Sequence, residues 1–145
     1  MTRSIAIFVT TAALLMSTSA LARDSLQQHP VDDVLSESGF AAQIAGVKFY
    51  FGDTAHPSAS REFGEYRTNK KTNAFNKSDK EACDWAFKSA ILALHQRAIN
   101  LGANAVINIR SNYKNNVTRS DTEYTCGAGK FVAGVALIGD FVVVE

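Results

Sequence analysis

The sequence predicts an α+β domain in which one long helix packs on a small, mainly antiparallel sheet. Apolar residues alternate with other side chains in IAGVKFYFGD at residues 44–53, which is typical of a half-buried strand. From residue 79 to 101 apolar residues recur at three- and four-residue steps, as on the buried face of a helix. After Gly102 the period returns to two. The expected order is strand, long loop, helix, strand and strand, with room for a further strand at the end.

The first 22 residues are expected to be a signal peptide. Arg3 precedes an apolar run from Ile5 to Met16, and Ala20 and Ala22 provide a small-residue cleavage site. The run is too short for the roughly 20 residues that a membrane-spanning helix needs. We therefore expect a periplasmic or secreted protein that is cleaved near Ala22 and has no membrane span in its mature form.

Three regions are expected along the chain. Residues 1–22 form the signal peptide, residues 23–43 form a loose N-terminal arm, and residues 44–145 form a single α+β domain. The arm is polar and its apolar residues follow no sustained period. We expect only one short turn in it, near residues 31–35. The remaining chain of about 120 residues suits one domain with a modest core.

The stretch TAHPSASREFGEYRTNKKTNAFNK at residues 54–77 is expected to be a long polar loop. Pro57, Gly64 and several Ser and Asn residues favour irregular structure there. A loop of this length is uncommon in a compact domain unless it is functional or held in place by its aromatic residues. Those residues are Phe63, Tyr66 and Phe75.

The helix is predicted to begin after Ser78 and to end before Gly102. Ser78 and Glu81 form a capping box, in which the serine hydroxyl accepts from the backbone N–H of Glu81. Gly102 suits the left-handed position that closes a helix. The apolar stripe is broad, and its members are Cys83, Trp85, Phe87, Ala90, Ile91, Leu92, Leu94, Ala98, Ile99 and Leu101.

Two strands are expected after the helix, at residues 103–112 and 124–138. The odd-numbered apolar residues from Ala103 to Ile109 are expected to face the core. The polar residues Asn104, Asn108, Arg110 and Asn112 are expected to form an outer stripe. In the second strand, Gly127, Gly129 and Gly134 indicate bulges or close backbone approach. Gly139 and Asp140 are expected to end it before the terminal segment FVVVE.

Cys83, near the start of the helix, and Cys126 are expected to lie close together. The helix continues for roughly 27 Å beyond Cys83, and the strand at residues 103–112 returns by roughly 30 Å. The following strand therefore starts beside the first helical turns, with Cys126 a few residues into it. In an exported protein with two cysteines we favour a structural disulfide. A redox-active pair and a metal clasp are the alternatives, although the chain has no C-x-x-C spacing and its three histidines are scattered.

Six cations between residues 61 and 80 are the candidate contacts for a partner or an anion. They are Arg61, Arg67, Lys70, Lys71, Lys77 and Lys80. They lead into the expected helix N-terminus, where unpaired N–H groups and the helix dipole favour anions. Acidic residues are interleaved among them, so an ordinary solvated loop is the alternative.

The balance of charge argues against a nucleic-acid partner. The whole chain has 15 basic and 14 acidic side chains, and only Arg3 lies within the first 22 residues. The processed chain is therefore formally neutral, and no global field draws it to nucleic acid or to anionic lipid.

No catalytic residue, cofactor or metal site is expected. Asp53 and His56 lie close in the sequence, as an acid and a base would, but no Ser or Cys nucleophile motif accompanies them. GAGK at residues 127–130 lacks the spacing of a phosphate-binding loop and precedes a strand instead of a helix. The sequence therefore predicts a protein that is not an enzyme.

Two segments of the chain resemble a family of small secreted proteobacterial proteins. They are CDWAFKSAILALHQRAINLGANAVINIRSNYKNN and TEYTCGAGKFVAGVALIGDFV. Some members carry the label excinuclease ATPase subunit. The resemblance covers residues 47–144 and depends on CxWAF and LGANAVxNI. The helix that ends in LGANAV is more distantly similar to YbjQ-type heavy-metal-binding domains and to the domain of the RcsF stress sensor. The last resemblance implies a small disulfide-bonded domain of the cell envelope.

We therefore expect an exported, non-enzymatic domain that binds or senses an envelope protein or a cell-wall component. The rival expectation is a protein that binds a small molecule, a metal or an anion.

Overall fold

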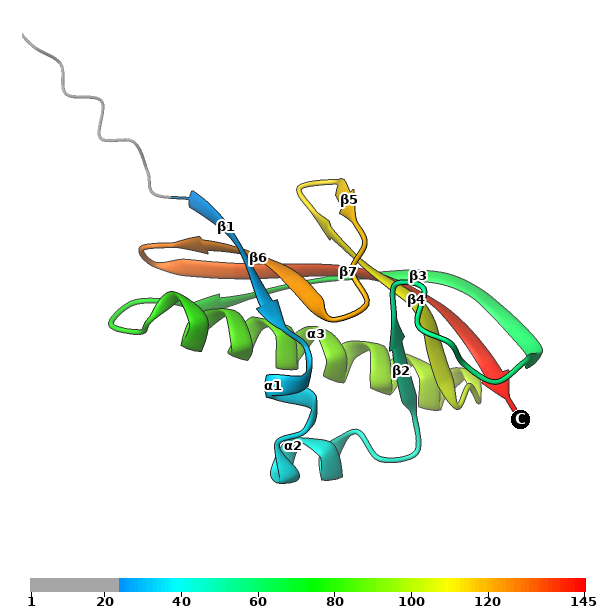
Figure 1. Cartoon of the computed structure of the whole chain (residues 1–145). Helices are drawn as coiled ribbons and strands as arrows, with labels where there is room; N and C mark the ends of the chain where they lie inside the picture. Colours follow the sequence, from blue (N-terminus) through cyan, green and yellow to red (C-terminus); the bar gives the residue numbers. More distant parts are fainter. Residues whose placement is uncertain (1–23) are drawn as a thin grey trace, which may run out of the picture.

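Within residues 24–145, one long helix crosses one face of a curled sheet of seven strands (Figure 1). This computed structural model describes residues 24–145, so the expected signal peptide and its cleavage site lie outside the described residues. The elements are β1 (Asp24–Pro30), α1 (Asp32–Leu35), α2 (Ser38–Gln43), β2 (Lys48–Phe51), β3 (Ala59–Asn73), α3 (Asp79–Leu101), β4 (Ala105–Tyr113), β5 (Asn116–Thr118), β6 (Glu123–Gly129) and β7 (Val132–Val144). The expected α+β class is confirmed, with a larger sheet than expected.

The sheet is organised around β7. One edge of β7 pairs with β3 along its whole length, from Ala59 opposite Val144 to Asn73 opposite Val132. The other edge pairs first with β6 and then with β4, which gives the order β1-β6-β7-β4-β2, and β5 adds to β4. All pairs are antiparallel except β2 with β4. The sheet is therefore mainly antiparallel, as expected.

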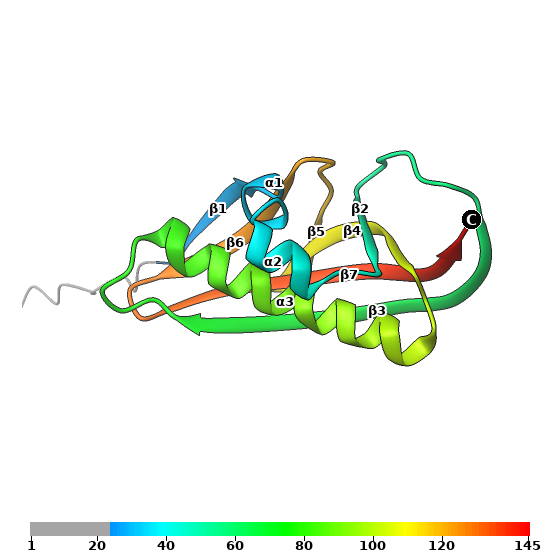
Figure 2. The ribbon, with the colours of Figure 1, turned by 90° about the horizontal axis from the view of Figure 1, so that it is seen from below.

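The predicted helix is confirmed at both ends. The Ser78 side chain accepts from the backbone N–H of Glu81 at 3.1 Å, and Gly102 closes α3 with a φ of 78°. Figure 2 shows α3 lying along β3 and β7. Its buried side chains are Ala82, Cys83, Ala86, Phe87, Ala90, Ile91, Leu94 and Ala98.

The ring of Phe87 joins α3 to the sheet. It stacks on Tyr124 of β6 with 4.0 Å between ring centroids, and its centroid lies 5.9 Å from that of the tilted Phe51 ring of β2. The Tyr124 hydroxyl donates to Asp84 Oδ1 at 2.7 Å. Burial, followed by this hydrogen bond, raises the pKa of Tyr124, so the hydroxyl stays protonated. The core thus fixes the first half of α3 over β6.

The disulfide between Cys83 and Cys126 is confirmed. The two Cα atoms are 5.8 Å apart, the Sγ atoms are bonded, and both side chains are fully buried. The bond joins the second helical turn to the middle of β6, beside the Phe87–Tyr124 stack. The disulfide therefore holds α3 against β6 at the same place as the Phe87–Tyr124 contact.

Trp85 and Ile99 are exceptions to the predicted buried stripe. Trp85 is 53% exposed and Ile99 is 50% exposed. The buried positions of α3 follow residues 82, 83, 86, 87, 90 and 91, so residue 85 falls on the solvent side of the helix. There the indole lies beside Lys88, whose Nζ is 5.3 Å from the ring centroid.

The expected loose arm at residues 23–43 is wrong for its described part. β1 pairs with β6 from Asp24 opposite Gly129 to Pro30 opposite Glu123, and the short helices after it bury Val34 and Phe40. The strand was missed because it lies at the edge of the sheet, where alternate side chains are exposed and few of them need to be apolar. β1, α1 and α2 therefore belong to the domain.

The expected loop at residues 54–77 is also wrong, because most of it forms β3. Its Lys, Asn, Arg and Glu residues are poor strand formers, yet its backbone pairs with β7 throughout. Irregular pairing between Glu62 and Gly64 shifts the alternation, so no sustained period of two is visible in the sequence. Phe63 and Tyr66 lie half-buried against the core, as expected of aromatic residues that hold this segment in place, whereas Phe75 is 52% exposed.

The predicted strand at residues 124–138 is two strands. The chain reverses at Lys130 and Phe131 and then continues through Gly139 and Asp140, where a break was expected. A Cβ at Gly139 would overlap the Val106 side chain, so this glycine allows β4 to approach closely and does not end the strand. Gly127 has a similar role, as expected, because a Cβ there would overlap the ring of Tyr113.

The predicted alternation in β4 fails in the middle of the strand. Asn108 has a φ of 52°, and the pairing with β7 shifts between Ile107 and Arg110. Val106 and Ile109 therefore belong to the core, whereas Ile107 does not. Asparagine tolerates this left-handed conformation better than most residues.

Candidate functional site

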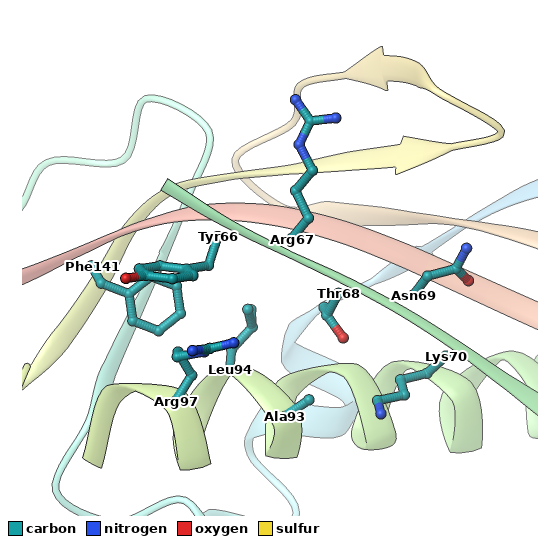
Figure 3. Close-up of a pocket in the computed structure, with 9 residues that line it drawn as sticks. All are labelled: Tyr66, Arg67, Thr68, Asn69, Lys70, Ala93, Leu94, Arg97 and Phe141. Carbon is teal, nitrogen blue, oxygen red and sulfur yellow. The ribbon is translucent and has the colours of Figure 1, made fainter. Parts of the chain in front are cut away.

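The six candidate cations do not gather into one patch. Arg61, Arg67, Lys70 and Lys71 lie along β3, Lys77 lies in the following turn, and Lys80 lies in the first turn of α3. Successive residues of β3 point to opposite sides of the sheet. In Figure 3, Arg67 points away from α3, whereas Lys70 points toward it.

Three of these cations already have partners within the fold. Lys80 Nζ lies 2.8 Å from Asp84 and 3.2 Å from Asp33, and the hydrogen bond to Asp84 is the main reason that the pKa of Lys80 is raised. The Arg67 guanidinium is 3.5 Å from Glu65, and that of Arg61 lies 4.7 Å from the ring centroid of Phe63. Of the six expected cations, Lys70, Lys71 and Lys77 have neither an ion-pair nor a ring partner among the described residues.

Two turns meet at one end of the molecule and expose aromatic rings there. Phe75, between β3 and α3, stacks on Phe131, between β6 and β7, with 5.9 Å between ring centroids. The backbone N–H of Ala74 donates to the Phe131 carbonyl at 2.8 Å, which holds the turns together. Phe131 is 58% exposed, Phe75 is 52% exposed and Val132 is 49% exposed.

Lysines surround these rings. The Lys130 Nζ lies 5.4 Å from the Phe131 ring centroid, and Lys77 donates to the Asn73 carbonyl at 3.0 Å. Lys71 lines a shallow cavity with Phe131 and Val132. We call Phe75, Phe131, Val132, Lys71, Lys77 and Lys130 the aromatic tip. Among the described residues, none of its three lysines belongs to an ion pair.

The aromatic tip carries charge of one sign. Residues 68–78 and 124–135 contain four lysines and no acidic residue. Asp24 lines the same shallow cavity as Lys71 and Phe131, but its carboxylate contacts Lys114. Asp79, in the first turn of α3, accepts from Gln27 Nε2 at 2.7 Å. Sequence reasoning missed this site since its two turns are more than fifty residues apart. The available signal was Phe131, which follows a lysine directly at a strand boundary.

A second site is a cleft of about 260 Å³ between β3 and α3 (Figure 3). Tyr66 packs edge-on against Phe141 at 5.2 Å, and the Arg97 guanidinium lies 4.6 Å from the Tyr66 ring centroid. Lys70 and Thr68 line the same cleft. Arg97 and Lys70 take part in no ion pair among residues 24–145, so the cleft presents two uncompensated cations.

The expected polar stripe of β4 connects strands on the outer face. Arg110 pairs with Glu65 of β3 and lies 3.7 Å from Asp140 of β7. Asn108 Nδ2 donates to the same Asp140 carboxylate at 2.8 Å. Only 12% of the Arg110 side chain is exposed, so this network fixes three strands together.

Asp53 and His56 have separate partners. Asp53 accepts from Arg119 at 2.9 Å, and His56 Nδ1 lies 2.8 Å from the Pro57 carbonyl. Within the described part of the chain, no hydrogen bond joins Asp53 to His56. Each of these two side chains therefore has a structural contact of its own.

Two further findings concern residues 24–145. No helix there is long and apolar enough to cross a bilayer. No three His, Cys, Asp or Glu side chains gather there as a metal ion would require.

No protein-family model, curated protein or solved structure matches this chain. Fold and site together define a disulfide-bonded α+β domain with a basic aromatic tip at one end and a basic cleft on one side.

Proposed function

We propose that this protein is an exported, non-enzymatic domain that binds a partner in the bacterial envelope through the aromatic tip. The observation that carries the proposal is the exposed stacked pair Phe75–Phe131, with Lys130 over the Phe131 ring and Lys71 in the cavity that Phe131 lines. The resemblance to small secreted proteins and the buried disulfide support an oxidising compartment.

The exposed ring pair has the features of a contact site. Isolated apolar side chains are common on protein surfaces, but a rigid stacked pair with a neighbouring valine is typical of a contact site. The pair is held by a backbone hydrogen bond between the two turns, so little conformational entropy is lost when a partner covers it. Pre-organised rings beside cations favour a partner with negative charge.

Replacing both rings tests the proposal. Phe75→Ser combined with Phe131→Ser is expected to shift the exported protein from the washed envelope fraction to the soluble fraction by about tenfold. Both side chains are more than half exposed, so the thermal midpoint should change little.

The matched control is Val117→Ser combined with Ile99→Ser, which removes similarly exposed side chains elsewhere. That variant should distribute between fractions as the unaltered protein does. Equal distribution of the tip variant and the unaltered protein would contradict the proposal.

A second candidate function is the binding of a small anion in the cleft between β3 and α3. The specific observation is that Arg97 and Lys70 face one cleft without an ion-pair partner among the described residues. Inorganic phosphate should then raise the thermal midpoint of the protein and of Lys48→Gln, an exposed lysine that does not line the cleft, but not of Arg97→Gln. An unchanged midpoint of the unaltered protein at high phosphate would dismiss this candidate.

A further inference from the structure

We propose that the partner of the aromatic tip is the surface of a bilayer that contains anionic phospholipid. Phe75, Phe131 and Val132 insert among the lipid head groups, while Lys71, Lys77 and Lys130 contact lipid phosphates. The inference rests on the proposed function, because it names the partner of that site.

The arrangement of side chains fits a membrane interface. Aromatic rings are stable at the boundary between head groups and hydrocarbon, and lysines keep their ammonium groups in water while their stems cover apolar surface. At the aromatic tip the Lys130 ammonium already lies 5.4 Å from the Phe131 ring centroid. Lys130 and the Phe131 ring would therefore reach the bilayer surface together.

The distribution of charge gives the tip a preferred direction. The processed chain is formally neutral, but residues 68–78 and 124–135 carry four lysines and no acid. An anionic surface attracts each lysine near it, which corresponds to about a fivefold change in partition for each one. The three tip lysines together then account for about a hundredfold preference for anionic over neutral lipid.

The small area of the tip favours a bilayer over a folded protein. A stable protein interface covers about 800 Å² on each partner. The tip consists of two turns with three exposed apolar side chains. Such a wedge is short of a standard protein interface, but shallow insertion into a bilayer needs only a few apolar side chains and nearby cations.

The test uses the exported protein and vesicles of two compositions. Co-flotation should show partition into vesicles of phosphatidylglycerol with phosphatidylethanolamine, and weak partition into pure phosphatidylcholine vesicles. Lys130→Gln should weaken binding to anionic vesicles about fivefold. Lys48→Gln, an exposed lysine on β2 at the other end of the helix, should leave it unchanged.

Tryptophan fluorescence reports which part of the protein inserts. Trp85 is the only tryptophan of the chain and lies on the solvent side of α3. Its emission should stay constant when anionic vesicles are added to the unaltered protein. In a Trp85→Phe background, the tryptophan of Phe131→Trp should emit at shorter wavelength when anionic vesicles are added. Brominated lipid should quench that emission.

Two results would overturn the inference. One is a lack of partition into anionic vesicles, and the other is an unshifted Phe131→Trp emission on bound vesicles. If vesicles do not bind but the Phe75→Ser, Phe131→Ser variant still leaves the envelope fraction, the proposed function stands with a different partner. If neither effect occurs, the tip is not a contact surface.

Discussion

Replacing both cysteines with alanine is expected to lower the free energy of unfolding by about 4 kcal/mol. The two residues are 43 positions apart, and opening a loop of that length releases about this much chain entropy in the unfolded state. Alanine leaves no polar atom in the fully buried site, so the loss reports the cross-link with a small cavity contribution. Urea titration of the oxidised protein and of the double variant measures the difference.

The single variants Cys83→Ala and Cys126→Ala provide the control. Each removes the same covalent bond, so either should account for most of the loss seen in the double variant. If the double variant unfolded at the same urea concentration as the oxidised protein, the disulfide would not be a structural clamp.

Gly127→Ala is expected to lower the free energy of unfolding by about 2 kcal/mol, because added atoms overlap a packed neighbour. The Tyr113 ring lies directly over Gly127, and a Cβ at Gly134 would be only 3.5 Å from the same ring. The Tyr113 hydroxyl donates to Asp24 at 3.2 Å, which holds the ring in place. The methyl group would force this ring away from the paired glycines of β6 and β7.

A double-mutant cycle isolates that contact. In a Tyr113→Ala background, Gly127→Ala should change stability by less than about 0.5 kcal/mol, since the three atoms nearest to the added Cβ all belong to the Tyr113 side chain. Gly39→Ala, where a Cβ meets no atom within 4 Å, is the matched control and should be neutral or slightly stabilising. Equal losses for Gly127→Ala in both backgrounds would show that Tyr113 is not the cause.

The parts of the fold that the sequence predicts correctly are those with strong local signals. Ser78 and Gly102 mark the ends of α3 with specific capping chemistry, and both ends are confirmed. The approach of Cys83 to Cys126 follows from the rise of a helix and the return of a strand, both of which are fixed by backbone geometry.

The strands that the sequence did not predict were missed for a common reason. β1 and β3 are stabilised by backbone pairing with β6 and β7, and their side chains are largely polar because much of each strand faces solvent. Pairing of this kind depends on the neighbouring strand and leaves little trace in the strand's own sequence. The irregularities near Gly64 and Asn108 further shift the alternation on which strand prediction depends.

The candidate site was predicted in part. Lys71 and Lys77 belong to both the expected cationic group and the aromatic tip, whereas Lys80 is held in ion pairs with Asp33 and Asp84. Lys130 and Phe131 join the site only through the pairing of β7 with β3. The net charge of the chain also did not predict the basic tip, because a neutral chain can still separate its charges in space.

The central claim is that the aromatic tip is the surface through which this protein contacts the envelope. The most direct test places a photo-crosslinking residue at position 131 in living cells and compares it with the same residue at position 117, a similarly exposed site. The account predicts adducts with an envelope component at position 131 and none above background at position 117. Equal adduct yields at the two positions would contradict it.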